Sequence, residues 1–170
     1  MSPERELARL YDEHALALFA FLLNLTRNEA DTRDLLQDLF VKLARQPELL
    51  HEVRDERSFL LRLAHNAAID LMRRRTSRDQ RNESFTVETL SVFAPAADPD
   101  EQAFRNALAE ALGELPPDQR AVVHLKLWAG LTFEEIAETL EIPLNTAASR
   151  YRYGLDKMRA RLRPLYEELQ

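Results

Sequence analysis

Apolar residues recur at steps of three and four along the N-terminal part of the chain. The first run extends from Leu7 to Leu25, and this spacing places its side chains on one face of a helix. The chain has only three glycines, Gly113, Gly130 and Gly154. It therefore cannot form a Gly-rich phosphate loop, and it is too poor in turn residues for an all-β fold. We predict an all-α protein.

Three amphipathic runs make up the first part of the chain. The first predicts a helix over residues 4–26, and Asn28 with Asp31 fits a capping box at the start of the second. The third run, over residues 60–75, ends in three consecutive arginines. We expect the helices to form one bundle, a first domain over residues 1–76. The apolar stripe predicted to be buried in the third helix is Leu60, Leu63, Ala64, Ala67 and Leu71.

The helical periodicity weakens between Ser77 and Gln102. Residues 91–99 read SVFAPAADP, a composition that cannot bury enough apolar surface to fix a fold. The weakly periodic segment carries six acidic residues against two arginines. We predict a flexible acidic linker over residues 77–102 and a second helical domain over residues 103–170. The predicted fold class is all-α, with two small helical domains joined by this linker.

The distribution of charge favours localised contacts with nucleic acid over non-specific coating. The formal net charge is −6, from 23 basic and 29 acidic residues, which argues against a protein that coats nucleic acid. Residues 62–81 nevertheless hold six arginines and two aspartates, and residues 144–163 hold six basic residues and one aspartate. Two compact basic stretches thus lie in an acidic protein.

The composition excludes several chemistries. The chain has no cysteine, which rules out disulfides, thiolate catalysis and cysteine metal sites. Nothing in the sequence resembles a Ser-His-Asp catalytic arrangement. We therefore expect no enzymatic activity, no cofactor and no metal. His14 and Trp128 lie in apolar runs and are predicted to be core residues. No apolar run approaches the ~20 residues of a membrane span. We expect a cytoplasmic protein without membrane insertion.

The C-terminal part has the spacing of a helix-turn-helix. Thr132 and Glu135 form a capping box, residues 141–143 form a tight break, and Asn145 is placed to cap the next helix. In this motif the second helix presents polar side chains to the major groove. A helical hairpin whose arginines only solvate the surface is the alternative. The side chains of the second helix predicted to point outward are Ala148, Ser149, Arg152 and Tyr153, with Arg150 at the shoulder, where it can contact a phosphate.

Two other helix faces carry polar patterns. The third helix has a strip of basic, amide and apolar side chains that suits single-stranded nucleic acid, although an ordinary charged helix end fits equally well. The second helix has an acidic face, either solvated or a docking face for a basic partner. The strip consists of Arg62, His65, Asn66, Ile69 and Arg73, and the acidic face includes Asp34, Gln37 and Asp38.

The order of these motifs resembles the extracytoplasmic-function (ECF) sigma factors, two-domain initiation factors of bacterial transcription. The resemblance covers nearly the whole chain. In the first domain it is carried by LYDEHALALFAFLLNLT, DLLQDLFVKL and SFLLRLAHNAAIDLMRRR. In the second domain it extends from Ala111 to Leu162, including LTFEEIAETLEIPLNTAASRYRYGL.

The resemblance implies a function and partners for each face. It implies that the helix of Asp34, Gln37 and Asp38 docks on the clamp of core RNA polymerase. It implies that the strip on the third helix opens and holds the minus-10 element of promoter DNA, and that the helix-turn-helix reads the minus-35 element. The residues assigned to the minus-10 element are Arg62, His65, Asn66 and Arg73. Those assigned to the minus-35 element are Lys126, Thr146, Ser149, Arg150, Arg152 and Tyr153.

The resemblance also implies an anti-sigma partner. At some positions, however, the sequence departs from the family pattern. The family usually has glycine at Glu141, a basic residue at Ala148 and arginine at Tyr153, so Arg152 with Tyr153 is expected to read a different minus-35 sequence. The alternative function is a sigma-like decoy that sequesters an anti-sigma protein.

Overall fold

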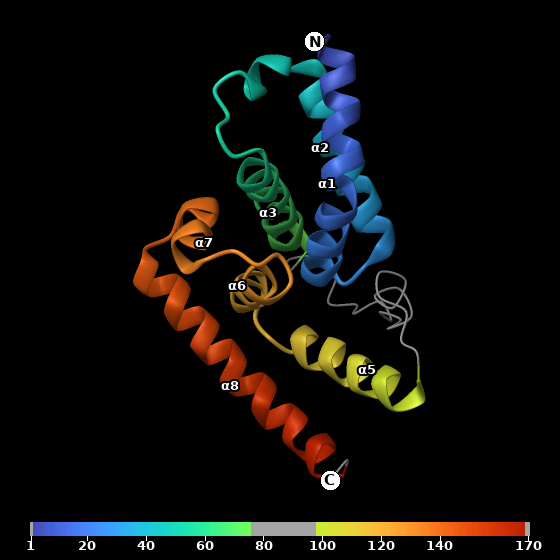
Figure 1. Ribbon diagram of the computed structural model, residues 1–170, viewed down its shortest axis with the longest axis vertical. Helices are drawn as coiled ribbons and strands as arrows, with labels where there is room; N and C mark the ends of the chain where they lie inside the picture. The colour runs from blue at the N-terminus through green and yellow to red at the C-terminus, as the bar shows by residue number, and fades with distance from the viewer. Residues whose placement is uncertain (1, 76–97, 169–170) are drawn as a thin grey trace. The chain divides into compact units, whose positions relative to one another are not determined.

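The computed structural model describes residues 2–75 and 98–168, and all of its regular structure in these ranges is helical (Figure 1). The all-α prediction is confirmed. Contacts between residues divide the chain into two compact units, which are described separately below. The elements are α1 (Pro3–Thr26), α2 (Glu29–Arg45), a short 3-10 helix η1 (Pro47–Leu50), α3 (Glu56–Arg75), α5 (Pro99–Gly113), α6 (Pro117–Leu127), α7 (Phe133–Leu140) and α8 (Leu144–Glu168).

Side-chain caps and one left-handed residue define the ends of the first two helices. The Ser2 hydroxyl caps α1 by accepting from the backbone N–H of Arg5 at 3.3 Å. The helix ends at Arg27, which adopts the left-handed conformation with φ 58°. The Asn28 side chain then caps α2 by accepting from the N–H of Asp31 at 2.9 Å, as the sequence predicted. One short turn therefore reverses the chain between α1 and α2.

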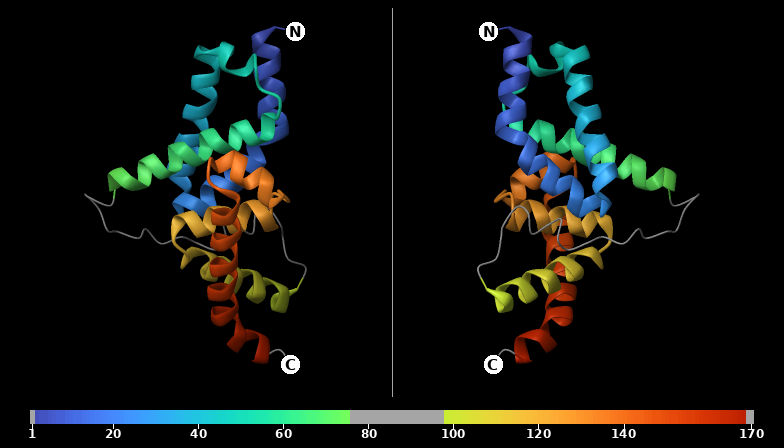
Figure 2. Two further views of the ribbon diagram at one scale, coloured as in Figure 1. Left: turned by 90° about the vertical axis from the view of Figure 1, so that its left-hand side faces the viewer. Right: turned by 90° about the vertical axis from the view of Figure 1, so that its right-hand side faces the viewer.

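The core of the first unit forms where α2 and α3 both pack on α1, and α3 runs across the α1–α2 pair (Figure 2). The side chains that α3 buries are Leu60, Leu61, Ala64 and Ala68. The predicted stripe was wrong at Leu63, Ala67 and Leu71, which are only partly buried. Leucine and alanine occur on several sides of this helix, so their spacing alone could not fix the buried face.

The beginning of α5 corrects the predicted end of the linker. The Asp98 side chain caps this helix, accepting from the N–H of Glu101 at 2.7 Å, and Pro99 occupies its first position. Residues 99–102 are therefore helical, although the sequence had placed them in the linker. The predicted linker residues 77–97 lie outside the described part of the chain.

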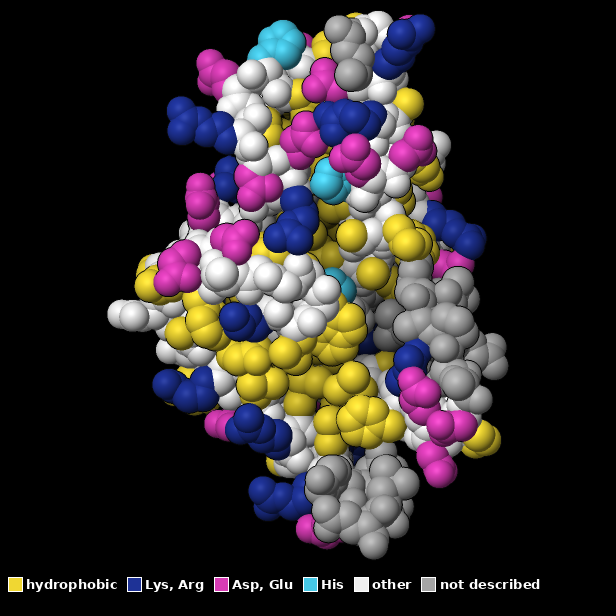
Figure 3. All heavy atoms as spheres, in the orientation of Figure 1, with side chains coloured by type: hydrophobic (Ala, Val, Ile, Leu, Met, Phe, Trp, Pro, Cys, Tyr) yellow, Lys and Arg dark blue, Asp and Glu magenta, His cyan; other side chains and the backbone are white. Residues whose placement is uncertain are grey.

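The second unit is organised around contacts of α8 with α5 and α6. Buried Arg120 stabilises the turn between α5 and α6, because it donates to the Leu115 carbonyl at 2.9 Å and so satisfies an acceptor left over at a helix end. Hydrophobic side chains gather over the face where α5, α6 and α8 meet (Figure 3). The buried cluster of this unit consists of Ala111, Leu112, Leu115, Val123 and Met158, with Leu108, Tyr151 and Leu162 packed against it.

Two residues predicted to be core lie elsewhere. Trp128, just after α6, is 47% exposed, and its ring stacks on His124 at a centroid distance of 5.7 Å. His14 is only partly buried, with its Nε2 3.8 Å from carboxylate oxygens of Glu13 and Glu56. In the described part of the chain, the helices are all too short or too polar to cross a membrane.

Gly154 provides a direct test of how closely α8 approaches α6. A Cβ atom at this position would lie 2.8 Å from Cγ2 of Val123, closer than packed carbon atoms tolerate. We expect Gly154→Ala to destabilise the protein by about 1 to 2 kcal/mol, because overpacking outweighs the gain of about 1 kcal/mol in helix propensity. Chemical denaturation measures the change. In a Val123→Ala background the same substitution should become neutral or stabilising, and a stabilising effect in the native background would contradict the close approach.

Candidate nucleic-acid interface

One long face of α2 is acidic and exposed. Leu36, Leu39, Phe40 and Leu43 of this helix are buried, and the opposite side presents Asp34, Gln37 and Asp38 to solvent. Val41, which is 39% exposed, continues this side by one turn. The helix thus offers a surface of two carboxylates, an amide and an apolar side chain, which can complement a basic partner.

The strip predicted on α3 is only partly exposed. Asn66 and Arg73 are exposed, whereas Arg62 and His65 are partly buried. The His65 ring stacks on Phe21 of α1, with the centroids 6.4 Å apart. The residues of this strip that are most open to a ligand are therefore Asn66 and Arg73.

The three arginines that end α3 have different environments. Arg74 forms an ion pair with Asp70 one turn earlier in the same helix. Arg75 forms a two-pronged ion pair with Asp31, at the start of α2. The sequence pattern showed a single basic cluster and gave no sign of the Asp31 pairing, because 44 residues separate the partners.

The helix-turn-helix is confirmed from α7 to α8. The N–H of Thr132 donates to the Glu135 carboxylate and the N–H of Glu135 donates to the Thr132 hydroxyl, both at 3.1 Å, which is the predicted capping box. In the turn, Glu141 has φ 57°, a conformation that glycine adopts with less strain. The prediction that Asn145 caps the next helix was wrong. That helix, α8, begins at Leu144, and the Pro143 carbonyl accepts its first backbone hydrogen bonds.

Two of the residues predicted to read DNA, Arg152 and Tyr153, lie on the exposed side of α8. Ala147, Gly154 and Met158 are buried, as the periodicity predicted, whereas Arg152 and Tyr153 are exposed. Thr146, Ser149 and Arg150 are partly buried along the same helix.

Ring and carboxylate contacts orient three cations of this surface. The Arg152 guanidinium lies 5.3 Å from the centre of the Tyr153 ring, and Lys126 Nζ lies 4.7 Å from the centre of the Phe133 ring. Both contacts are cation–π interactions that hold a charge without neutralising it. Arg150 instead lies with its Nε 3.4 Å from a carboxylate oxygen of Asp118, so part of its charge is compensated.

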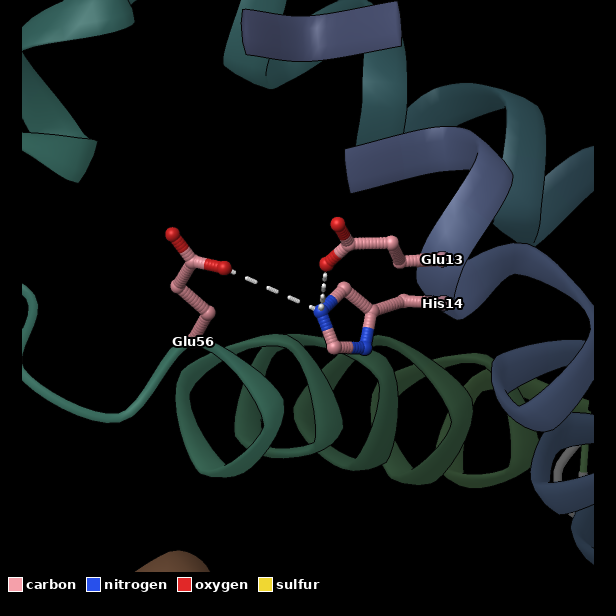
Figure 4. A group of neighbouring side chains, drawn as sticks. All are labelled: Glu13, His14 and Glu56. Atoms are coloured by element: carbon pink, nitrogen blue, oxygen red, sulfur yellow. Dashed lines mark ion pairs between the residues drawn. The ribbon is translucent and has the colours of Figure 1, made fainter. Parts of the chain in front are cut away.

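A cluster of Glu13, His14 and Glu56 has ligand atoms within 4.8 Å of one another, and Figure 4 shows both carboxylates directed toward the imidazole. The Arg9 guanidinium already pairs with both carboxylates of this cluster. It donates to both oxygens of Glu56, at 2.7 and 3.2 Å, and to Glu13 at 3.1 Å. The hydrogen bonds from Arg9 lower the pKa of Glu56. The cluster is therefore an ion-pair network that joins the beginning of α1 to the beginning of α3.

Comparisons with known proteins agree with this arrangement. The family described as Sigma-70 region 2 matches residues 10–78, and that described as Sigma-70, region 4 matches residues 105–158. The ECF RNA polymerase sigma factor SigL of Mycobacterium tuberculosis is 30% identical over 158 residues, which cover 92% of this chain and 88% of that protein. The ECF RNA polymerase sigma factor SigX of Bacillus subtilis is 28% identical over 165 residues, covering 94% and 85%.

The chain belongs to the ECF sigma factors. As a sigma factor it binds core RNA polymerase and directs it to promoters.

Two solved structures share the fold. The sigma factor RpoE of Bartonella quintana, in complex with the anti-sigma factor NepR, has a TM-score of 0.69 at 21% identity, with 94% of this chain and 96% of that chain covered. CnrH, in complex with the cytosolic domain of CnrY, has a TM-score of 0.66 at 24% identity, with 95% and 90% covered.

The stability contributed by the Arg9–Glu56 ion pair is expected to depend on pH. Because the pKa of Glu56 is lower in the folded protein than its usual value of 4.5, the pair stabilises the fold fully above that pH. Its contribution is lost as the pH falls through the lowered value. We expect Glu56→Gln to reduce stability at neutral pH and to differ progressively less from the native protein in acid. Urea denaturation at several pH values measures this, with Glu4→Gln, an exposed change in α1, as the control. A constant difference at every pH would contradict the assignment.

Proposed function

We propose that the two described units divide the work of promoter recognition. The first unit, residues 1–76, binds the clamp of core RNA polymerase through Asp34, Gln37 and Asp38. It opens and holds the minus-10 element through Arg62, His65, Asn66 and Arg73. The second domain, proposed over residues 103–170 and preceded by the first residues of α5, reads the minus-35 element.

The observation that carries this proposal is the contrast between the exposed polar faces of α2, α3 and α8 and their buried apolar faces. Carboxylates on α2 complement a basic protein surface. An amide and a guanidinium on α3 suit an unstacked strand, because a cation can follow the backbone while an amide holds a base. The guanidinium of Arg152, beside an exposed aromatic ring on α8, suits the major groove.

The proposed minus-35 surface comprises residues that contact base edges and residues that contact phosphates. Arg152 and Tyr153 are the most exposed and contact base edges, with Thr146 and Ser149 beside them along α8. Arg150, which is partly compensated by Asp118, contacts a phosphate. Lys126 supplies a second phosphate contact. Because Tyr153 stands where the family usually has arginine, the sequence read here differs from the family's usual one.

We further propose that the protein acts in the cytoplasm, performs no catalysis of its own and is held inactive by an anti-sigma factor. RNA synthesis then belongs entirely to the polymerase. The anti-sigma proposal is supported by the sigma factor RpoE of Bartonella quintana, which shares the fold and was solved in complex with the anti-sigma factor NepR.

The α2 face can be tested by charge reversal. We expect Asp34→Lys with Asp38→Lys to abolish holoenzyme formation, because both carboxylates face the polymerase. The fold should be unaffected, since exposed substitutions usually change stability by less than about 0.5 kcal/mol. Binding to labelled core polymerase measures the effect. The matched control is Glu4→Lys with Asp12→Lys, which makes the same change of charge on exposed positions of α1. Equal binding by the two double variants would show that the face is wrongly assigned.

Substitution of a base-contacting residue of α8 and of a phosphate-contacting residue of α8 should give different phenotypes. We expect Arg152→Ala to relax the base preference at a minus-35 position at a cost of about 1 to 3 kcal/mol, and Arg150→Ala to weaken binding to all sequences. Selection from randomised minus-35 sequences with the holoenzyme separates the two. Arg163→Ala removes the same charge from an exposed position further along α8 and is the control. The same uniform loss for Arg152 and Arg150 would overturn the distinction.

A further inference from the structure

An ion pair between Arg75 and Asp31 attaches the last turn of α3 to the beginning of α2. Both Nη atoms of Arg75 donate to the two carboxylate oxygens of Asp31, with Nη2 and Oδ1 2.7 Å apart. The Asp31 side chain is only 12% exposed, whereas Arg75 lies half in solvent. Two parallel hydrogen bonds between a planar guanidinium and a carboxylate fix orientation as well as distance. The pair therefore constrains where α3 ends.

Several hydrogen bonds stabilise the turn that contains Asp31. The backbone N–H of Asp31 donates to the Asn28 side chain at 2.9 Å, and the Thr32 hydroxyl donates to the Asn28 carbonyl at 2.8 Å. The hydroxyl oxygens of Thr26 and Thr32 lie 2.8 Å apart, which links the end of α1 to the same turn. Arg75 thus connects α3 to a network of side-chain hydrogen bonds at the turn between α1 and α2.

The neighbouring arginine forms a pair of a different kind. Arg74 pairs with Asp70 four residues earlier in α3, and both side chains are well exposed, at 74% and 60%. A pair within one helix cannot hold that helix against another. The two adjacent arginines therefore offer a matched comparison, because they have the same charge and the same type of partner, but Asp70 lies on the same helix as Arg74 and Asp31 lies on a different helix from Arg75.

We propose that Asp31 and Arg75 are positioning residues for promoter opening. Asp31 lies one turn before Asp34 on the helix that binds polymerase, and Arg75 lies two residues after Arg73 on the helix that holds the minus-10 strand. The pair sets where the end of α3 lies relative to the polymerase-bound helix, and hence where Arg73 meets the separated strand. This inference rests on the proposed function of the two faces.

The test uses the full-length protein as holoenzyme on a promoter that it transcribes. Asp31→Asn keeps the shape and an acceptor oxygen but removes the charge that holds Arg75. We expect it to reduce permanganate-reactive open complexes on duplex promoter roughly tenfold, since small misplacements of a reacting group are costly. Core binding and activity on a premelted bubble template should be near normal. Arg75→Gln should give the same phenotype, and the double variant should be no worse than either single one. Asp70→Asn, the matched control, should open promoters normally.

Each other outcome decides the question. An equal loss on duplex and premelted templates, or a loss of core binding, would indicate that the pair only maintains the fold and would overturn the proposal. Arg75→Lys, which keeps the charge without the paired geometry, provides a second variant that is expected to fold and to show an intermediate opening defect.

A parallel variant, Asn66→Ala with Arg73→Ala, tests the proposed function itself. If it lowers promoter opening while Asp31→Asn does not, the positioning role is wrong and the assignment of the α3 strip stands. If it leaves opening unchanged, the minus-10 assignment fails.

Discussion

The packing of α2 and α3 on the apolar face of α1 is the constraint on which the first unit depends. Leu10, Phe21 and Leu22 of α1 are completely buried, and both other helices contact this helix. Because the apolar faces of α2 and α3 are buried against α1, their polar faces must point outward. The ion pairs Arg9–Glu56 and Asp31–Arg75 then fix α3 at its beginning and at its end. The surfaces assigned to polymerase and to DNA are thus consequences of one shared core.

Small side chains in the second unit allow a close contact between two of its helices. The missing side chain at Gly154 lets α8 approach Val123 of α6, and Ala147 is completely buried at the beginning of α8. Arg120 stabilises the turn that precedes α6. The side of α8 opposite this close contact is left for Arg152 and Tyr153. The recognition proposed for this helix therefore depends on a contact made by its other face.

The sequence predicted features that depend on neighbouring residues and missed those that depend on distant ones. The helices, the Asn28 cap and the Thr132–Glu135 capping box were all predicted, because each follows from residues within one or two turns. Trp128 was misplaced because it ends an apolar run yet lies outside the core. The pairing of Asp31 with Arg75 could not be predicted, since a run of three arginines does not indicate which of them has a partner 44 residues away.

Transcription with purified components tests whether this sigma factor directs polymerase to promoters through the two DNA-reading surfaces proposed. Core RNA polymerase with and without the protein would transcribe sheared genomic DNA of the source organism, and sequencing would map the RNA 5′ ends. The account predicts new start sites that depend on the protein and share two upstream motifs, one near minus-35 and one near minus-10. A folded protein that binds core polymerase yet produces no new start sites would contradict it.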